Sequence, residues 1–400
     1  MSTAVAHRPL RDALHRRLLE SPFDVSTLAR DELRSRLALM LRDEAPLTDP
    51  RAAALVLDEL VDDVGGLGPL EPLLADATVT EIMVNGPARV YVERDGRIAP
   101  YVCDIDATTI VRIAERVIAP LGLRLDRASP IVDARLGDGS RLHAVLPPLA
   151  PDGPCLTIRR FAARPVTLAE FGLDASAAAF LQTIVHAGWN VLVSGATSAG
   201  KTTLCNALAG SIDATERIVT IEETAELRLG QMHVVRLEAR PANAEGAGAV
   251  SVRDLVRAAL RMRPDRLIVG EVRGGEALDM LQALNTGHDG SLSTVHANSP
   301  EDALSRLETL TLLAGVPLPL PAVRAQIAAA VDAVVQVARG ADGRRVVAAI
   351  AEVAGPLDAV TRVKPLLVGN GGRLVAAERP RRPARRAGID LTEPWDRCRR

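Results

Sequence analysis

The spacing of apolar residues changes twice along the chain, and each change marks a different kind of structure. Residues 8–64 place apolar side chains at helical spacing among Arg, Asp and Glu, which predicts two or three amphipathic helices. Short runs typical of strands follow over 78–163, interrupted by one helical pattern at 107–121. From 175 to 297, strand patterns alternate with helical ones. This alternation predicts a parallel sheet covered by helices on both faces.

The breaks between these patterns predict the domain organisation. Glycine and proline interrupt the helical pattern at 64–74, and a second linker lies at 162–173. We therefore predict an α/β protein with a helical N-terminal segment at 1–65, a small mixed α/β domain at 66–163, a larger α/β domain at 164–355 and a C-terminal extension at 356–400.

The end of the chain is rich in arginine. From residue 379 it reads RPRRPARRAGIDLTEPWDRCRR, with eight arginines, three prolines and no core periodicity. This composition is typical of a disordered tail. The tail is either simply solvated, which we expect, or in contact with acidic lipid or RNA.

Residues 191–203, VLVSGATSAGKTT, match the P-loop pattern, in which a buried strand leads into a glycine-rich loop and a helix. Gly195 and Gly200 permit backbone angles and a close approach that side chains would block. Lys201 supplies a charge to the β- and γ-phosphates, and the Thr202 hydroxyl is a ligand for Mg²⁺. The alternative is a chance turn rich in glycine and alanine. The predicted phosphate-binding residues are Gly195, Ala196, Thr197, Ser198, Ala199, Gly200, Lys201, Thr202 and Thr203.

Composition narrows the class of protein. The chain has 400 residues, 48% of them hydrophobic, and a formal net charge of −2, which argues against a general electrostatic grip on nucleic acid. The four cysteines are scattered, so neither a disulfide framework nor a zinc site is expected. No apolar run reaches the length of a membrane span, and the charged N-terminus is no signal peptide. We expect a cytoplasmic protein.

Carboxylates follow two of the predicted strands. Glu271 ends the apolar strand RLIVGE about 70 residues after the P-loop, the geometry in which a neighbouring strand delivers an acid beside Mg²⁺. Glu222 and Glu223 end the strand that begins at 217. They either hold metal-bound water and orient the nucleophile, or form a solvated acidic turn.

Histidines and arginines supply further candidates. His288 and His296 lie in TGHDGSLSTVHANS, where His296 either senses the γ-phosphate or is structural. Arg141, Arg159 and Arg160 lie in the smaller domain; they are either surface residues of an arginine-rich protein or arginine fingers that reach the phosphates when that domain closes. The same two interpretations apply to the last candidate, Arg273.

Several of these segments together resemble a known family. GATSAGKTT, RIVTIEETAEL, RPANAEG, RLIVGEVRGGEALDM and TGHDGSLSTVHANS are similar to the secretion ATPases of type II and type IV systems, in the CpaF/TadA branch that powers Tad (Flp) pilus assembly. LGPLEPLLADATVTEIMVNGPARVYVERDG extends the resemblance to the smaller domain, so that it covers roughly residues 60–355.

The resemblance implies a RecA-like ATPase domain that uses ATP with Mg²⁺, an N-terminal domain that clamps the nucleotide, and a homohexameric ring. It maps Glu222 and Glu223 onto the family's Asp box and Glu271 onto an atypical Walker B, in which it contacts Mg²⁺ directly or through water. His288 and His296 fall in the His box. Arg141 and Arg159 match arginines that reach the phosphates, and Arg160 is the substitute for Arg159. Glu223 stands where the family usually has Asp.

The function implied by the resemblance is a motor that hydrolyses ATP at the inner face of the cytoplasmic membrane. Its partners are integral inner-membrane platform proteins, and pilin indirectly, with no direct contact to nucleic acid. Three alternatives stay open: a conjugation-type transfer ATPase, a RecA-like nucleic-acid motor, and an assembly switch that binds ATP with negligible turnover.

Overall fold

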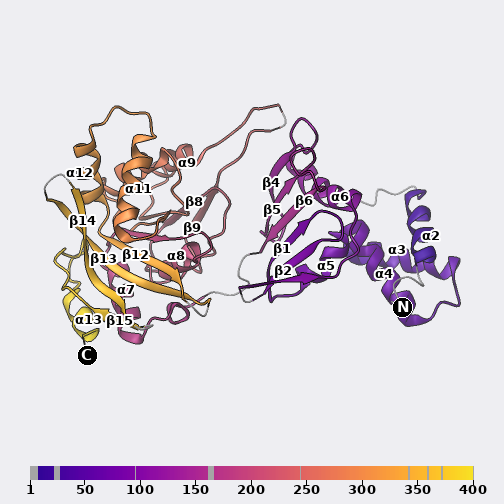
Figure 1. The fold of residues 1–400 in the computed structure, drawn as a ribbon, viewed down its shortest axis with the longest axis horizontal. Helices are drawn as coiled ribbons and strands as arrows, with labels where there is room; N and C mark the ends of the chain where they lie inside the picture. Colours follow the sequence, from indigo (N-terminus) through magenta and orange to yellow (C-terminus); the bar gives the residue numbers. More distant parts are fainter. Residues whose placement is uncertain are drawn as a thin grey trace. The chain divides into compact units, whose positions relative to one another are not determined.

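The computed structural model describes residues 8–21, 28–94, 96–160, 166–243, 245–340, 343–357, 360–370 and 373–399. The chain divides into two compact units, Met1–Phe161 and Ala162–Arg400 (Figure 1). Within the described residues, no helix is both long enough and apolar enough to cross a membrane.

Three helices begin the first unit, as the helical spacing predicts. They are α2 (Arg8–Leu19), α3 (Arg30–Glu44) and α4 (Pro50–Gly65). Leu33, Leu37 and Leu41 lie on one face of α3 and pack in a small core shared by the three helices. The helical N-terminal segment therefore has a hydrophobic core of its own.

A six-stranded antiparallel sheet forms the rest of the first unit, and its strands lie within 78–163, where the sequence predicts strands. The sheet order is β3-β2-β1-β6-β5-β4. One face is covered by α5 and α6, with leucine and isoleucine side chains in between. The elements are η2 (Gly68–Leu70), α5 (Glu71–Ala75), β1 (Val79–Asn85), β2 (Val90–Arg94), β3 (Arg97–Tyr101), α6 (Ala107–Ile118), η3 (Ala119–Leu121), β4 (Ile131–Arg135), β5 (Arg141–Val145) and β6 (Cys155–Arg159).

A nine-stranded sheet organises the second unit, in the order β15-β14-β13-β12-β7-β11-β10-β8-β9. The six strands from β12 to β9 are parallel, and β13, β14 and β15 extend the sheet in antiparallel fashion. The strands are β7 (Val191–Gly195), β8 (Ile218–Glu222), β9 (Val234–Glu238), β10 (Arg266–Val269), β11 (Leu292–His296), β12 (Ala333–Arg339), β13 (Arg345–Leu357), β14 (Val360–Asn370) and β15 (Arg373–Ala376).

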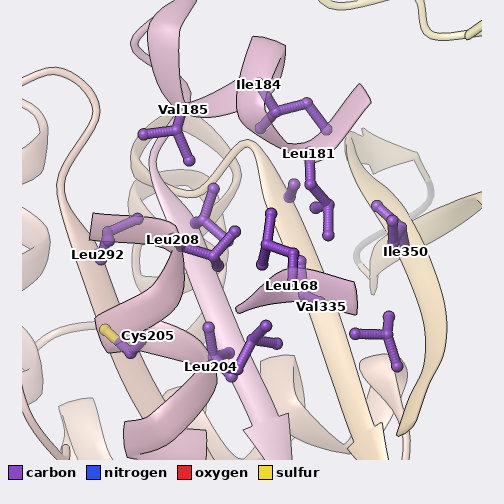
Figure 2. Packing of buried hydrophobic residues seen from close by; sticks show 14 of the residues in the cluster. Leu168, Leu181, Ile184, Val185, Leu204, Cys205, Leu208, Leu292, Val335 and Ile350 are labelled. Atoms are coloured by element: carbon purple, nitrogen blue, oxygen red, sulfur yellow. The ribbon is translucent and has the colours of Figure 1, made fainter. Parts of the chain in front are cut away.

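Helices cover both faces of this sheet, which confirms the predicted α/β architecture. Alternate residues of β7 belong to cores on opposite faces of the sheet: Val191 and Val193 pack with residues of α7 and α8, and Leu192 packs on the other side. Figure 2 shows the first of these cores, with Leu181 and Leu208 among its residues. The helices are η4 (Leu168–Phe171), α7 (Ala175–His186), α8 (Lys201–Ala209), α9 (Val252–Ala259), α10 (Glu276–Leu284), α11 (Pro300–Leu312), α12 (Leu320–Ala330) and α13 (Thr392–Arg397).

The prediction of a disordered tail from residue 379 was wrong for the described residues. The side chains of Arg382 and Arg385 both pair with Asp332, which is 2% exposed. Further along, Trp395 of α13 is buried and its indole N–H donates to the Leu366 carbonyl at 3.2 Å. Composition predicts disorder because arginine is rarely buried, but each of these arginines meets a carboxylate, and the tryptophan supplies an apolar anchor.

A buried ion triplet also joins the tail to the sheet. Arg266, at the start of β10, is fully buried and donates to Glu216 through Nε at 2.6 Å. Arg386 of the tail pairs with the same carboxylate, with Nη1 at 2.8 Å from its oxygen. Burial acts to raise the pKa of Glu216, but hydrogen bonds and charge from the two arginines lower it to about 2.

We predict that Glu216→Gln lowers the free energy of unfolding by about 3–5 kcal/mol at pH 7, because Arg266 then keeps a buried charge without its counter-charge. The folded-state pKa lies below the ordinary value of 4.5, so this contribution is complete above pH 4.5 and declines as the pH falls toward 2. The gap between wild type and variant should therefore narrow below pH 4.5, as measured by urea denaturation at pH 7, 5, 4 and 3.

Glu378→Gln is the matched control, because Glu378 is an exposed tail carboxylate and should change stability little. A gap that stays constant from pH 7 to pH 3 would contradict the role given to the triplet.

Candidate functional site

The parallel pairing of strands gathers the predicted site at one edge of the sheet. β7, β11, β10 and β8 all run in the same direction, so their carboxyl ends meet at this edge. The loop after β7, His296 at the end of β11, Glu271 after β10 and Glu223 after β8 therefore become neighbours. Residues 100 positions apart in the sequence lie in one row because the intervening helices return the chain to the opposite edge.

The loop after β7 has the backbone that a phosphate cradle needs. Gly200 has φ +100° and Ser198 φ +57°, and both values lie in the left-handed region. A Cβ on Gly195 would lie 2.6 Å from the Val337 carbonyl oxygen, so a glycine is required there by close approach. Helix α8 begins at Lys201, and the N–H groups of its first turn point toward the loop, where an anion is favourable.

Lys201 connects this loop to His296. The lysine is 7% exposed, and its Nζ lies 3.1 Å from the Ala196 carbonyl oxygen and 3.2 Å from Nδ1 of His296. Burial lowers the pKa of His296; the Glu271 carboxylate opposes this, and the charges of Lys201 and Arg273 add to it. A neutral ring can accept a hydrogen bond from the lysine and present its other nitrogen to a carboxylate.

That carboxylate belongs to Glu271. Its Oε1 is in ion-pair contact with Nε2 of His296, and among the described residues this buried oxygen has no partner with hydrogen-bond geometry. The other oxygen accepts from Nε of Arg273 at 2.8 Å, and Nη1 of Arg273 reaches Glu223 at 2.7 Å. Lys201, His296, Glu271, Arg273 and Glu223 therefore form a continuous chain of polar contacts beside the loop.

Thr202 and Glu271 fit the requirements of a magnesium ion. Mg²⁺ usually binds through one or two protein oxygen groups together with substrate phosphates and water. Thr202 is half-buried on the first turn of α8, next to Lys201. Glu271 offers a buried oxygen that is not committed to a hydrogen bond. These two residues would hold the ion, Glu271 directly or through water.

Glu222 ends β8, as the sequence predicts, and its carboxylate contacts the turn that follows the strand. It is 3% exposed and accepts hydrogen bonds from the backbone N–H groups of Glu226 at 2.9 Å and Leu227 at 3.0 Å. Burial raises its pKa to about 7, although these hydrogen bonds oppose the shift. Glu222 therefore holds the turn that follows β8, and its catalytic role stays a prediction.

The same carboxylate side chain explains the glycine in the atypical Walker B segment. A Cβ on Gly270 would lie 2.7 Å from Cγ of Glu222, so a larger residue at 270 collides with it.

Two other predicted residues lie away from the P-loop. His288 precedes β11, at the opposite end of this strand from His296, and its Nδ1 lies 2.9 Å from the Ala283 carbonyl oxygen. Arg160 contacts the carbonyl oxygens of Leu73, Asp76 and Val79 within the first unit. Both side chains have contacts with backbone carbonyl groups, and the cofactor-binding roles stay predictions.

Arg141 and Arg159 lie in the first unit, on neighbouring strands. They are directly opposite each other in the β5–β6 register, and Arg141 pairs with Asp133 at 3.3 Å. Arg159 is exposed and also lies opposite Glu81. Their approach to the P-loop stays a prediction.

Two arginines that the sequence reasoning missed contact the P-loop. Nε of Arg339 lies 3.3 Å from the Ser198 carbonyl oxygen, and Nη1 of Arg345 lies 3.3 Å from the Thr203 hydroxyl. The sequence signal for them is RGADGRR, a Gly- and Asp-containing turn between two apolar runs, which predicts a hairpin with an arginine on each arm.

Together, the strand–loop–helix unit, the parallel sheet and the row of charged groups define an α/β domain with a charged site at the carboxyl edge of its sheet. The chain belongs to the type II/IV secretion system protein family, whose model matches residues 63–357. The predicted resemblance to secretion ATPases of these systems is confirmed at this level.

Individual relatives agree with the family. The chain is 46% identical over 318 residues to a putative conjugal transfer protein of Mycobacterium tuberculosis, covering 76% of this chain and 89% of the relative. It is 38% identical over 312 residues to the type IV secretion system protein PtlH of Bordetella pertussis, covering 69% and 90%. The crystal structure of the pilus retraction motor PilT with bound ADP has the same fold, with a TM-score of 0.53, 21% identity, and coverage of 72% of this chain and 83% of that one.

We predict that Gly270→Ala lowers the free energy of unfolding by about 1–3 kcal/mol, because its methyl group displaces Glu222 from the turn. In a Glu222→Ala background, where the space is free, the same substitution should cost little. The measurement is a double-mutant cycle by chemical denaturation.

Gly230→Ala is the control for this cycle, since a Cβ at Gly230 meets nothing within 4 Å. Equal costs of Gly270→Ala in both backgrounds would show that Glu222 is not the reason for the glycine.

Proposed function

We propose that this chain is a Mg²⁺-dependent ATPase and that ATP binds at the loop between β7 and α8. The observation that carries the proposal is the contact chain Lys201–His296–Glu271 at the mouth of a loop whose backbone suits phosphates. Lys201 is a compact ammonium that reaches the β- and γ-phosphates, and the N-terminus of α8 adds its partial positive charge. Bound Mg²⁺ would neutralise charge that develops on the phosphate oxygens.

Glu271 is the residue proposed to polarise the attacking water. It lies next to the histidine that contacts Lys201, and its buried oxygen is free of hydrogen bonds among the described residues. Arg273 ties Glu271 to Glu223, so Glu223 orients the site from the next strand without taking the proton itself. The hydrogen bonds that Glu222 accepts from the backbone support the choice of Glu271 over Glu222.

His296 is proposed to report the presence of the γ-phosphate. Lys201 contacts His296, and a γ-phosphate would compete for the same ammonium. Loss of that contact frees Nδ1 of His296, which can then turn toward the phosphate while Glu271 is released for water. Binding of the third phosphate is thereby linked to the position of the carboxylate that uses it.

The free energy of ATP hydrolysis is proposed to drive mechanical work. As in the family that the sequence resembles, six copies form a ring, and Arg141 and Arg159 of the first unit close on the phosphates. Hydrolysis removes the γ-phosphate charge that these arginines bind, so the first unit moves. This movement is passed to integral platform proteins of the inner membrane. The protein is peripheral, at the cytoplasmic face, and the resemblance to the CpaF/TadA branch makes assembly of Tad pilins its proposed task.

A second candidate is a conjugation-type transfer ATPase. Relatives named as conjugal transfer proteins in Mycobacterium tuberculosis and Rhizobium radiobacter, with 46% and 34% identity, favour it. A nucleic-acid motor is distinguished from both by turnover that DNA or RNA stimulates, and an assembly switch by binding without turnover.

We predict that Glu271→Gln lowers kcat for ATP by about 10² or more while ADP binding is retained, because the amide cannot accept the proton of water. Lys201→Ala should abolish turnover without unfolding the protein. The measurement is phosphate release by the purified full chain with Mg²⁺, together with native mass with and without nucleotide, for which a species of six subunits is expected.

Glu301→Gln, at an exposed glutamate near the start of α11, is the control and should turn over like wild type. Wild-type turnover by Glu271→Gln would overturn the assignment of the water-polarising residue, and wild-type turnover by Lys201→Ala would overturn the ATPase site.

A further inference from the structure

The P-loop has a second charged neighbour, on the side of β7 opposite to the acids. In the sheet order, β11, β10 and β8 with their carboxylates lie on one side of β7, and β12 with β13 lies on the other. Arg339 is the last residue of β12, Arg345 is the first residue of β13, and the two are register partners. The hairpin therefore carries one arginine on each side of its turn, one from each strand.

Both arginines contact the P-loop. Arg339 reaches the carbonyl oxygen of Ser198, in the middle of the loop. Arg345 reaches the hydroxyl of Thr203, on the first turn of α8, and its side chain passes over Gly200, where a Cβ would lie 2.6 Å from its Cδ. Position 200 therefore favours glycine for two reasons: the Arg345 side chain lies against it, and its φ is positive.

The strand that carries Arg339 is fixed firmly to the P-loop strand. β12 is parallel to β7, with Gln336 opposite Ser194 and Val337 opposite Gly195. The Gln336 side chain accepts from the Ser194 hydroxyl and donates to the Ala297 carbonyl at 3.3 Å, which spans β7. Binding groups held on rigid strands lose little entropy when a ligand arrives.

The sheet order also gives a direction to the phosphate chain. Lys201, His296 and Glu271 mark the γ-phosphate end, on the β11–β10 side. A P-loop cradles the α- and β-phosphates with its backbone while its lysine reaches the β- and γ-phosphates. The α-phosphate therefore lies toward Thr203 and the β12–β13 hairpin.

The arginines on the β12–β13 side of the P-loop favour the binding of an anion. The two guanidinium groups contact the loop and the first turn of α8, whose N-terminus is favourable for an anion. Guanidinium forks match phosphate oxygens in geometry, and hydrogen bonds between two charged groups are about twice as strong as neutral ones.

We propose that Arg339 and Arg345 bind the α-phosphate of the nucleotide and set its affinity, for ATP and ADP alike. This rests on the proposed function, since it takes the P-loop as a nucleotide site. The two arginines differ in role from Lys201, His296 and Glu271: they act on the phosphate common to both nucleotides, so they determine binding, and the residues across β7 determine hydrolysis.

The test measures ADP binding to the full chain by calorimetry with Mg²⁺, using Arg339→Ala, Arg345→Ala and the double variant. Each single substitution should raise Kd by roughly 10- to 100-fold, the loss of a hydrogen bond to a charged group. KM for ATP should rise by a similar factor, with kcat within roughly threefold of wild type. Arg344→Ala is the matched control, an exposed arginine adjacent in sequence, and should bind ADP like wild type.

Inorganic tripolyphosphate separates contact with phosphate from contact with the nucleoside. Its affinity should fall in the arginine variants by the same factor as that of ADP. An unchanged tripolyphosphate affinity with weakened ADP binding would overturn the α-phosphate assignment. Arg345→Lys, which keeps the stem and the charge, should recover part of the ADP affinity.

The remaining outcomes are also decisive. If an alanine variant fails to fold, Arg345→Gln and Arg339→Gln repeat the measurement with the stems retained. ADP binding that is unchanged in the variants, with wild type binding normally, overturns this proposal alone. If wild type itself does not bind ADP, the proposed function falls with it.

Discussion

The parallel pairing of β7 with β11 on one side and β12 on the other is the constraint on which the rest of this structure depends. It places the P-loop at the centre of the sheet's carboxyl edge, with acids and histidine to one side and arginines to the other. Gly195 shows how close the pairing is, because a Cβ there would meet the Val337 carbonyl oxygen at 2.6 Å. A shift of register by one residue would turn each of these side chains to the other face of the sheet.

Ion pairs join charged groups at both edges of the sheet. Along the edge, Arg273 lies between Glu271 and Glu223, and His296 lies between Lys201 and Glu271. At the opposite edge of the sheet, Arg266 and Asp332 are buried with carboxylates and arginines of their own. A buried charge without a partner is costly, so these networks fix the conformation in which the strands are held.

Much of the site could be predicted from the sequence, because its residues follow strands whose apolar runs are easy to recognise. The P-loop, Glu271 and His296 were placed in this way, and the structure brings them together. Glu222 and Glu223 could not be separated, since side chains alternate at a strand end and the sequence does not say which one points inward. The sequence predicts disorder for the tail because Arg386 pairs with Glu216, which lies 170 residues away in the sequence. Local composition gives no information about a partner so distant.

The strands β13, β14 and β15 were missed for a related reason. They add to the sheet by antiparallel pairing beyond the region of alternating strands and helices, so the pattern that predicts a parallel sheet gives no hint of them. With them the sequence reasoning missed Arg345, which reaches the P-loop only because β13 pairs with β12.

The central claim is that ATP lies across the carboxyl edge of the sheet with its γ-phosphate at Lys201, His296 and Glu271. The most direct measurement is a crystal structure of the full chain with Mg²⁺ and a non-hydrolysable ATP analogue. The account predicts the γ-phosphate in contact with Lys201, which no longer contacts His296, and a metal-bound or free water beside Glu271. A triphosphate bound outside the P-loop, or with its γ-phosphate toward the β12–β13 hairpin, would contradict it.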